Sequence, residues 1–218
     1  MIQRLTVRMV IASLMCASAS AAVIINVPTE PIPFFSNPRI DIDGNGTDDF
    51  RFGGLPNASS VVITERANRY LGTPAIPPNA GGSPTALLDN TMIGGNSTPS
   101  GLVFLSSDSA DGFVPPDQNT GSATNLFLCV STGCSGEFLG EPGFTQRALL
   151  GVEFEAEDGI HFGYFDIETS VFRDSVILGF AYETEPNTPI LATFVPEPSS
   201  AMLVLGSLIL GLRRKRKN

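Results

Sequence analysis

The sequence predicts an all-β domain of antiparallel strands, of the sandwich or jelly-roll type. No long helical periodicity occurs between residues 23 and 195. Short β-rich runs there alternate with clusters of Gly, Pro, Asn and Ser, a pattern typical of sheets joined by turns. A chain of 218 residues is long enough for one well-buried domain or two small ones. We therefore expect residues 23–195 to form a single β-sandwich.

The clearest strands are three consecutive runs near the end of this body. Residues 148–157 alternate apolar side chains with glutamates, as in a strand with one buried face and one face in water. The expected inward side chains are Val152, Phe154 and Ala156, and the expected outward ones are Glu153, Glu155 and Glu157. A turn at Asp158-Gly159 leads into a strand at 160–168, and the more continuously apolar run 175–183 is expected inside the sandwich. These runs predict a three-stranded antiparallel meander.

Shorter strands are predicted earlier in the chain. They span residues 39–43, 50–52, 60–66, 102–105 and 126–130. Residues 71–101 are rich in turn formers and predict a long surface excursion. Residues 184–195 predict a last extended segment before the tail.

Both ends of the chain have the composition of targeting segments. Residues 1–22 contain Arg4 and Arg8, then a short apolar run, then small residues, which predicts a signal peptide removed by signal peptidase. The apolar segment 201–212 would form a helix of about 18 Å, against a hydrocarbon core of about 30 Å. The basic residues 213–217 behind it predict that the body lies outside the cytoplasm. The sequence therefore predicts an exported protein with transient membrane anchoring.

The tail resembles a known sorting signal. Pro196, Glu197 and Pro198 precede the short apolar segment and the basic cluster, an order similar to the PEP-CTERM signal of Gram-negative bacteria. The resemblance implies that an exosortase recognises this triplet within residues 196–218 and cleaves the tail. It implies an inner-membrane-anchored precursor and a mature protein at the cell surface or in the extracellular matrix. The alternative is an ordinary C-terminal anchor behind a proline-rich linker.

The body resembles a recurring, functionally uncharacterised type of PEP-CTERM surface protein. The similar stretches are residues 41–52, 162–168 and 177–190, together with the spacing between residues 138 and 168. This resemblance implies a β-sandwich and supplies no known activity or catalytic residues.

The body is strongly anionic. Between residues 23 and 195 it has six arginines and no lysine, and acidic side chains are spread through the same stretch. Nucleic acids and anionic membrane surfaces are bound through basic patches, so the charge excludes both as expected partners. It is compatible with cations or with an extracellular polysaccharide.

Two cysteines remain after residue 22. Cys129 and Cys134 bracket a Ser-Thr-Gly turn, and in an oxidising compartment such a pair predicts a disulfide at a hairpin tip. Free or metal-bound thiols are the alternative, but no further metal ligands occur in the neighbouring sequence.

Residues 41–49 (DIDGNGTDD) form the sharpest constellation of possible ligands. Asp41, Asp43, Asn45 and Asp49 occupy positions 1, 3, 5 and 9 of a calcium-loop pattern, and the carbonyl of Thr47 occupies position 7. Phe52 replaces the bidentate glutamate of an EF-hand, so the loop resembles the shorter DxDxDG-type loops of β-rich extracellular proteins. We expect calcium here; the alternative is a hairpin turn built from Asx residues.

Catalysis has two weaker candidates. Alternate glutamates on residues 153–157 would lie about 6.6 Å apart, a workable separation for glycoside hydrolysis, but a solvated strand face has the same pattern. His161, the single histidine, is expected on the surface beside these glutamates, paired with a cross-strand carboxylate. No Gly-x-Ser-x-Gly elbow accompanies it. We therefore expect no enzymatic activity.

The expected function is a structural or adhesive role in the cell envelope or its extracellular matrix. Two alternatives remain open. A calcium-dependent carbohydrate-binding module would show glycan binding that disappears with EDTA. A glycoside-active enzyme would lose turnover when Glu153, Glu155 or Glu157 is changed to Gln.

Overall fold

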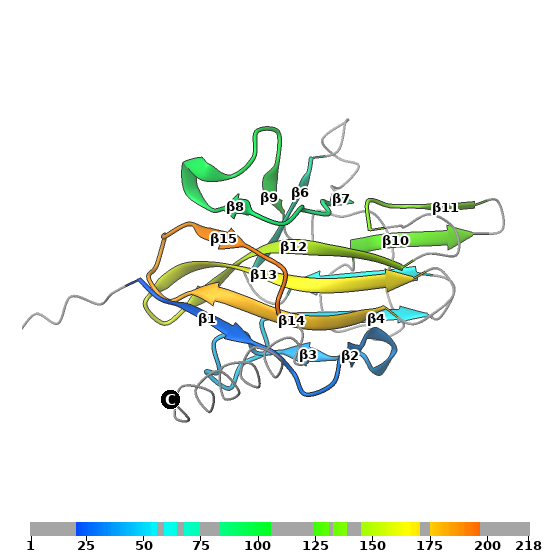
Figure 1. Cartoon of the computed structure of the whole chain (residues 1–218), viewed down its shortest axis with the longest axis horizontal. Helices are drawn as coiled ribbons and strands as arrows, with labels where there is room; N and C mark the ends of the chain where they lie inside the picture. The colour runs from blue at the N-terminus through cyan, green and yellow to red at the C-terminus, as the bar shows by residue number, and fades with distance from the viewer. Residues whose placement is uncertain are drawn as a thin grey trace, which may run out of the picture.

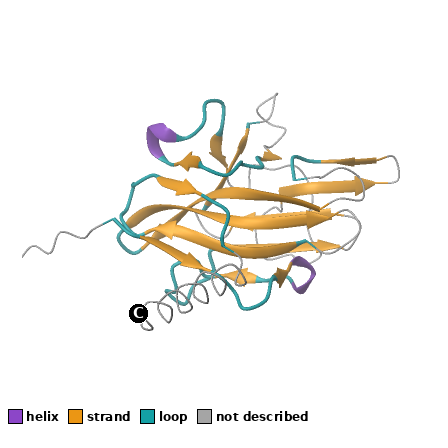
Figure 2. Ribbon diagram, in the orientation of Figure 1, coloured by secondary structure: helices purple, strands orange, loops and turns teal. Residues whose placement is uncertain are grey.

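The predicted all-β antiparallel sandwich is confirmed. The computed structural model describes residues 21–55, 59–64, 68–74, 83–105, 124–130, 133–138, 145–170 and 175–196 (Figure 1). Within them the strand pairs are antiparallel. The helical structure there consists of two short 3-10 turns, η1 (Phe34–Ser36) and η2 (Gly95–Ser97) (Figure 2).

The strands of the described residues form three sheets. The central sheet has the order β1-β14-β13-β12-β6-β7, with β2 beside β14 and β9 beside β6. Its strands are β1 (Val23–Asn26), β2 (Ile32–Pro33), β6 (Arg69–Thr73), β7 (Ser83–Pro84), β9 (Val103–Leu105), β12 (Thr145–Ala156), β13 (Gly159–Ser170) and β14 (Val176–Glu183). The second sheet has the order β11-β10-β5-β4-β3, from β3 (Arg39–Ile40), β4 (Phe50–Leu55), β5 (Ser59–Thr64), β10 (Thr124–Val130) and β11 (Gly133–Ser135). The small sheet pairs β15 (Ile190–Ala192) with β8 (Thr91–Ile93).

The main core lies between the central and second sheets. Val152 and Phe154 of β12 point into it, as the alternation predicted, and Ala156 packs against it. Phe165 of β13 meets Phe52 of β4 edge to face, with 4.8 Å between ring centroids. Such aromatic pairs stabilise a fold by about 0.5–1.5 kcal/mol beyond the contribution from burying their apolar surface. Facing aromatic rings therefore join the two sheets.

The opposite face of the central sheet is also covered. A second core there joins Leu149 of β12 and Tyr164 of β13 to Ile93 of β8 and Ile190 of β15. The chain is thus layered as second sheet, central sheet and small sheet. A strand covered on both faces has a more continuous apolar pattern than a half-exposed one. The run Ala148-Leu149-Leu150 at the start of the predicted strand fits that arrangement.

The predicted meander is confirmed, with a shift at its first turn. Strands β12, β13 and β14 are neighbours in the central sheet and run side by side in Figure 1. Ala156 pairs with Gly159, so the two turn residues are Glu157 and Asp158 instead of Asp158 and Gly159. Gly159 has a φ of 144°, a conformation that favours glycine, and therefore fits the position after the turn.

The predicted long surface excursion at residues 71–101 is wrong for its described part. Leu71, Leu87 and Ile93 are buried in the second core. Leu87 and Leu149 exchange two backbone hydrogen bonds of 2.9 and 3.1 Å, which fix this region to β12. The frequent turn residues were interpreted as surface loop, but they separate short segments that cover the second face.

Most of the terminal segments lies outside the described residues. This holds for residues 1–20 of the predicted signal peptide and for the predicted helix 201–212. In the part of the chain that the structure describes, no helix is long and apolar enough to cross a membrane.

Candidate metal site

The acidic loop at residues 41–49 joins two strands of the second sheet. β3 ends at Ile40 and β4 begins at Phe50, and these two residues face each other in the hairpin. The amide of Asp49 donates to the carbonyl of Ile40 over 2.9 Å, which closes the loop at its base. Ile42 and the side chain of Asp49 are buried, and residues 44–46 are exposed at the tip. The loop is therefore anchored at its base and open at its end.

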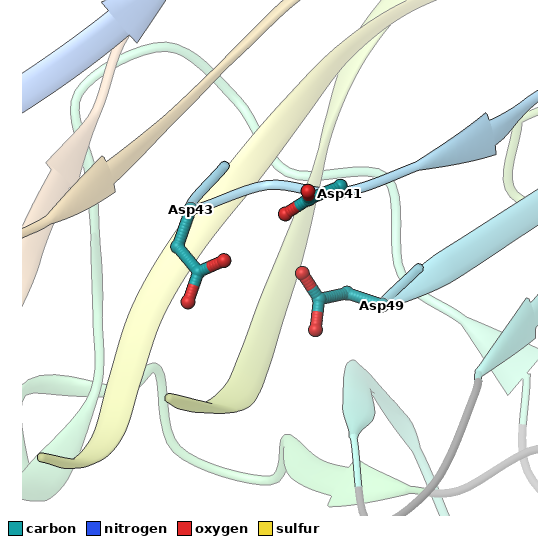
Figure 3. Close-up of side chains that lie close together, drawn as sticks. All are labelled: Asp41, Asp43 and Asp49. Atoms are coloured by element: carbon teal, nitrogen blue, oxygen red, sulfur yellow. The ribbon is translucent and has the colours of Figure 1, made fainter. Parts of the chain in front are cut away.

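Three carboxylates converge inside this loop. Asp41, Asp43 and Asp49 each offer an oxygen, and the three oxygens lie within 4.8 Å of one another. Figure 3 shows the three side chains directed toward a common point. Because calcium binds oxygens at 2.3–2.6 Å, two ligands of one ion are at most about 5 Å apart. The spacing of the triad is compatible with a single calcium ion.

The loop conformation is set by hydrogen bonds to Asp41. One carboxylate oxygen, Oδ1, accepts from the amides of Gly44 and Asn45 at 2.8 and 3.1 Å, and Oδ2 accepts from Gly46 at 2.6 Å. Gly44 and Gly46 have φ values of 77° and 87°, which residues with a side chain rarely adopt. The glycines thus let the backbone wrap around Asp41. Each carboxylate oxygen has two acceptor sites, so Oδ2 keeps one for a cation.

The other two predicted ligands take part in bracing the loop. The side-chain nitrogen Nδ2 of Asn45 donates to Oδ2 of Asp43 over 2.9 Å, and the side-chain oxygen Oδ1 of Asn45 accepts from the backbone amide of Thr47 over 2.8 Å. Asn45 therefore orients Asp43. Ligation by Asn45 and by the carbonyl of Thr47 remains a prediction.

Asp49 is the buried member of the triad. Its side chain is 1% exposed, and Oδ2 accepts from the amide of Ile42 over 2.9 Å. Burial, reinforced by the charges of Asp43 and Asp41, raises the pKa of Asp49 to about 6 despite hydrogen bonds from Ile42 and Asn68. Gathered carboxylates repel one another unless they bind a proton or a cation. The loop thus gathers negative charge around a buried carboxylate.

Sequence reasoning missed Asn68, which links the loop to the central sheet. Its side-chain amide donates to the backbone oxygen and to Oδ1 of Asp49 over 3.2 and 3.1 Å. Its carbonyl oxygen accepts from the amide of Glu155 in β12 over 2.9 Å. Asn68 is 1% exposed. An asparagine far from the loop in sequence carries no motif that would have identified it.

The predicted row of water-facing glutamates is only partly correct. Glu155 and Glu157 are exposed, but Glu153 is buried and forms an ion pair with Arg69 of β6. Arg69 Nε donates to Glu153 over 2.8 Å. The row was expected to be solvated because β12 was assigned one covered face. The second core covers the other face, and Arg69 reaches Glu153 from β6, the neighbouring strand of the same sheet. The arrangement gives Glu153 a structural partner.

The predicted position of His161 is wrong. Its side chain is 3% exposed and stacks on Phe154, with ring centroids 5.6 Å apart. Phe154 and His161 face each other in the hairpin and therefore share the main-core face, while Glu153 faces Phe162. Nε2 of His161 lies 2.8 Å from Asp158 in the turn, and Nδ1 lies 2.8 Å from the backbone oxygen of Glu183. The hydrogen bond with His161 lowers the pKa of Asp158.

The backbone places the two cysteines opposite each other. Cys129 of β10 faces Cys134 of β11 in an antiparallel pair. Opposite residues of such pairs have Cα atoms about 4.5–5.5 Å apart, within the range that disulfides require. The side chains of both cysteines lie outside the described part of the structure, so the disulfide remains a prediction.

The predicted sorting motif begins at the end of the described chain. Pro196 is described and exposed, whereas Glu197 and Pro198 lie outside the described residues.

No family model, no curated protein and no solved structure matches this chain. The assignment of function therefore rests on the residues and their geometry.

Proposed function

We propose that this chain is an exported, non-enzymatic protein of the cell envelope whose β-sandwich is stabilised by calcium bound to Asp41, Asp43 and Asp49. The convergence of the three carboxylates to within 4.8 Å is the observation that carries the calcium assignment. Asn45 orients Asp43, and Asn68 ties Asp49 to the central sheet. An ion at this position would join the loop to two layers of the fold.

The proposed location is supported by the sequence. Residues 1–22 have the composition of a signal peptide, and residues 196–218 resemble a sorting signal that an exosortase would cleave. Calcium at millimolar concentrations outside the cell suits an exposed loop, because extracellular sites bind with dissociation constants of about 10⁻⁴ to 10⁻³ M. The role would be structural or adhesive, with anionic surfaces joined to matrix polysaccharide through cations.

Calorimetric titration of the full chain with calcium tests the metal site. We expect one calcium ion per chain and no measurable binding by Asp43→Ala. Asp48→Ala is the matched control, because Asp48 lies in the same loop but pairs with Arg39 over 3.3 Å, outside the triad. Equal binding by the wild type and Asp43→Ala would contradict the proposed site.

Replacement of Pro196, Glu197 and Pro198 by alanine tests the sorting signal in cells. The proposal predicts that the variant accumulates as an unprocessed precursor in the inner-membrane fraction, while the wild type is shortened and reaches the surface or the medium. Unchanged processing of the alanine variant would contradict sorting through this triplet.

A further inference from the structure

The segment at residues 190–195, here called the C-terminal stem, is an integral part of the fold. Its strand β15 pairs with β8, and Ile190, Ala192 and Val195 are buried in the second core. The amide of Phe194 donates to Oδ1 of Asp89 over 2.9 Å. The stem therefore covers the second face of the central sheet, close to the position where the predicted sorting motif starts.

One ion pair holds both backbone groups of the last stem residue. Arg147 of β12 and Asp166 of β13 form two parallel hydrogen bonds of 2.9 and 2.7 Å. The amide of Val195 donates to Oδ2 of Asp166 over 2.8 Å, and its carbonyl accepts from Nη2 of Arg147 over 2.8 Å. The guanidinium carbon of Arg147 also lies 4.9 Å from the ring centroid of Phe194. We call Arg147 and Asp166 the stem clamp.

The stem clamp differs from an ordinary surface ion pair. Asp166 is fully buried, and its carboxylate accepts from Arg147 and from the backbone of the stem. A buried carboxylate needs such partners, because an uncompensated charge in the interior is strongly unfavourable. Release of the stem would remove one of these partners and expose the apolar side chain of Val195. The clamp should therefore keep the stem docked while the body is folded.

We propose that Arg147 and Asp166 are positioning residues that fix the stem and confine C-terminal processing to positions beyond Val195. The role in processing rests on the proposed sorting function, whereas the docking itself does not. A protease must hold several residues of its substrate in an extended, accessible form, and residues 190–195 have their backbone groups or side chains engaged with the body. Pro196, which directly follows the stem, is exposed. The clamp thus fixes Val195, the residue that directly precedes the Pro-Glu-Pro triplet, on the folded body.

Limited proteolysis of the full chain in detergent solution tests the clamp. Thermolysin cleaves before apolar residues, several of which lie in the stem, and mass spectrometry identifies the C-terminal end of each body fragment. Below its melting temperature, the wild type should lose residues beyond Val195 and resist cleavage within 190–195. Asp166→Asn and Arg147→Gln should be cleaved within the stem on the order of 100-fold faster, because cleavage follows the population of the locally open state.

A matched control separates clamp loss from general loosening of the sheet. Arg69→Gln breaks another arginine–carboxylate pair to β12, with Glu153, and leaves the contacts of Val195 intact. It should retain the wild-type fragment pattern. Wild-type cleavage within the stem, equal stem cleavage in clamp variants and wild type, or equal acceleration in Arg69→Gln would overturn the proposal.

Hydrogen exchange of the wild type keeps the test decisive if the clamp variants do not fold. The amide of Val195 should exchange much more slowly than in an unstructured peptide, and a peptide-like rate would overturn the proposal. The sorting proposal fails by a different result, namely unchanged cellular processing after alanine replacement of residues 196–198. Failure of the clamp and failure of sorting are therefore distinguishable.

Discussion

The side chain of Asn68 donates a hydrogen bond to the carboxylate of Asp49 and accepts one from the backbone of Glu155. These contacts connect the acidic loop of the second sheet with strand β12 of the central sheet. A cation bound by the loop would therefore act on the joint between two layers. The same geometry makes Asn68 a sensitive position for stability.

Asn68→Ala should destabilise the protein by about 1–3 kcal/mol, because it leaves the buried carboxylate of Asp49 and the partly buried backbone amide of Glu155 without this partner. Urea unfolding monitored by circular dichroism measures the change. Asn26→Ala, at an exposed position of edge strand β1, should change the stability by less than about 0.5 kcal/mol. Equal stability of the two variants would show that the hydrogen bonds of Asn68 do not contribute to the free energy of unfolding.

Asp49 should give the calcium-free protein a characteristic pH dependence. Its pKa is raised to about 6 in the folded state, while an unfolded aspartate titrates near 3.9. Between these values the folded state holds a proton that the unfolded chain has lost, so Asp49 stabilises the protein below about pH 4. This contribution is lost as the pH rises through about 6.

Urea unfolding in EDTA from about pH 4.5 to 7.5 measures this dependence in the wild type and in Asp49→Asn. The difference in unfolding free energy, wild type minus variant, should fall as the pH rises. A difference that stays constant over the range would exclude a raised pKa for Asp49.

The two glutamates Glu153 and Glu155 should respond differently to the same substitution. Glu153→Gln removes the charge that pairs with Arg69 and should cost about 1.5–3 kcal/mol. Glu155→Gln, on an exposed side chain, should change the stability by less than about 0.5 kcal/mol. Thermal melting at neutral pH compares them. An equal loss of stability in the two variants would contradict the role assigned to the ion pair of Glu153 with Arg69.

Under the proposed export, Cys129 and Cys134 should be linked by a disulfide. The register places them opposite each other, and the exported protein would fold in an oxidising compartment. Mass spectrometry of the peptide that contains both residues should show a gain of two hydrogens on reduction. A thiol titration that detects both cysteines in the unreduced, exported protein would rule the disulfide out.

The sequence was most informative where a local pattern determines the structure. The alternation of Val152 and Phe154 predicted the main-core face of β12, and the spacing of Asp41, Asp43 and Asp49 predicted that their carboxylates would converge. Both patterns act within a few residues. The fold class followed from the same short-range signals.

Long-range contacts account for what the sequence did not predict. Glu153 was expected in water, but its burial depends on Arg69, a residue from a distant strand. The environment of His161 depends on which residue it faces across the hairpin and on the backbone of Glu183. Likewise, the clamp on Val195 joins residues from three separate segments. No local sequence pattern predicts such contacts between residues that are far apart in the chain.

Thermal melting of the full chain with and without calcium tests the central claim most directly. At about 10 mM calcium, a site with a dissociation constant of about 10⁻⁴ to 10⁻³ M would add roughly 1.4–2.7 kcal/mol of stability. We predict a melting temperature that rises by several degrees in the wild type and in Asp48→Ala, is reversed by EDTA, and does not change in Asp43→Ala. An unchanged melting temperature in the wild type at this concentration would contradict a calcium-stabilised domain.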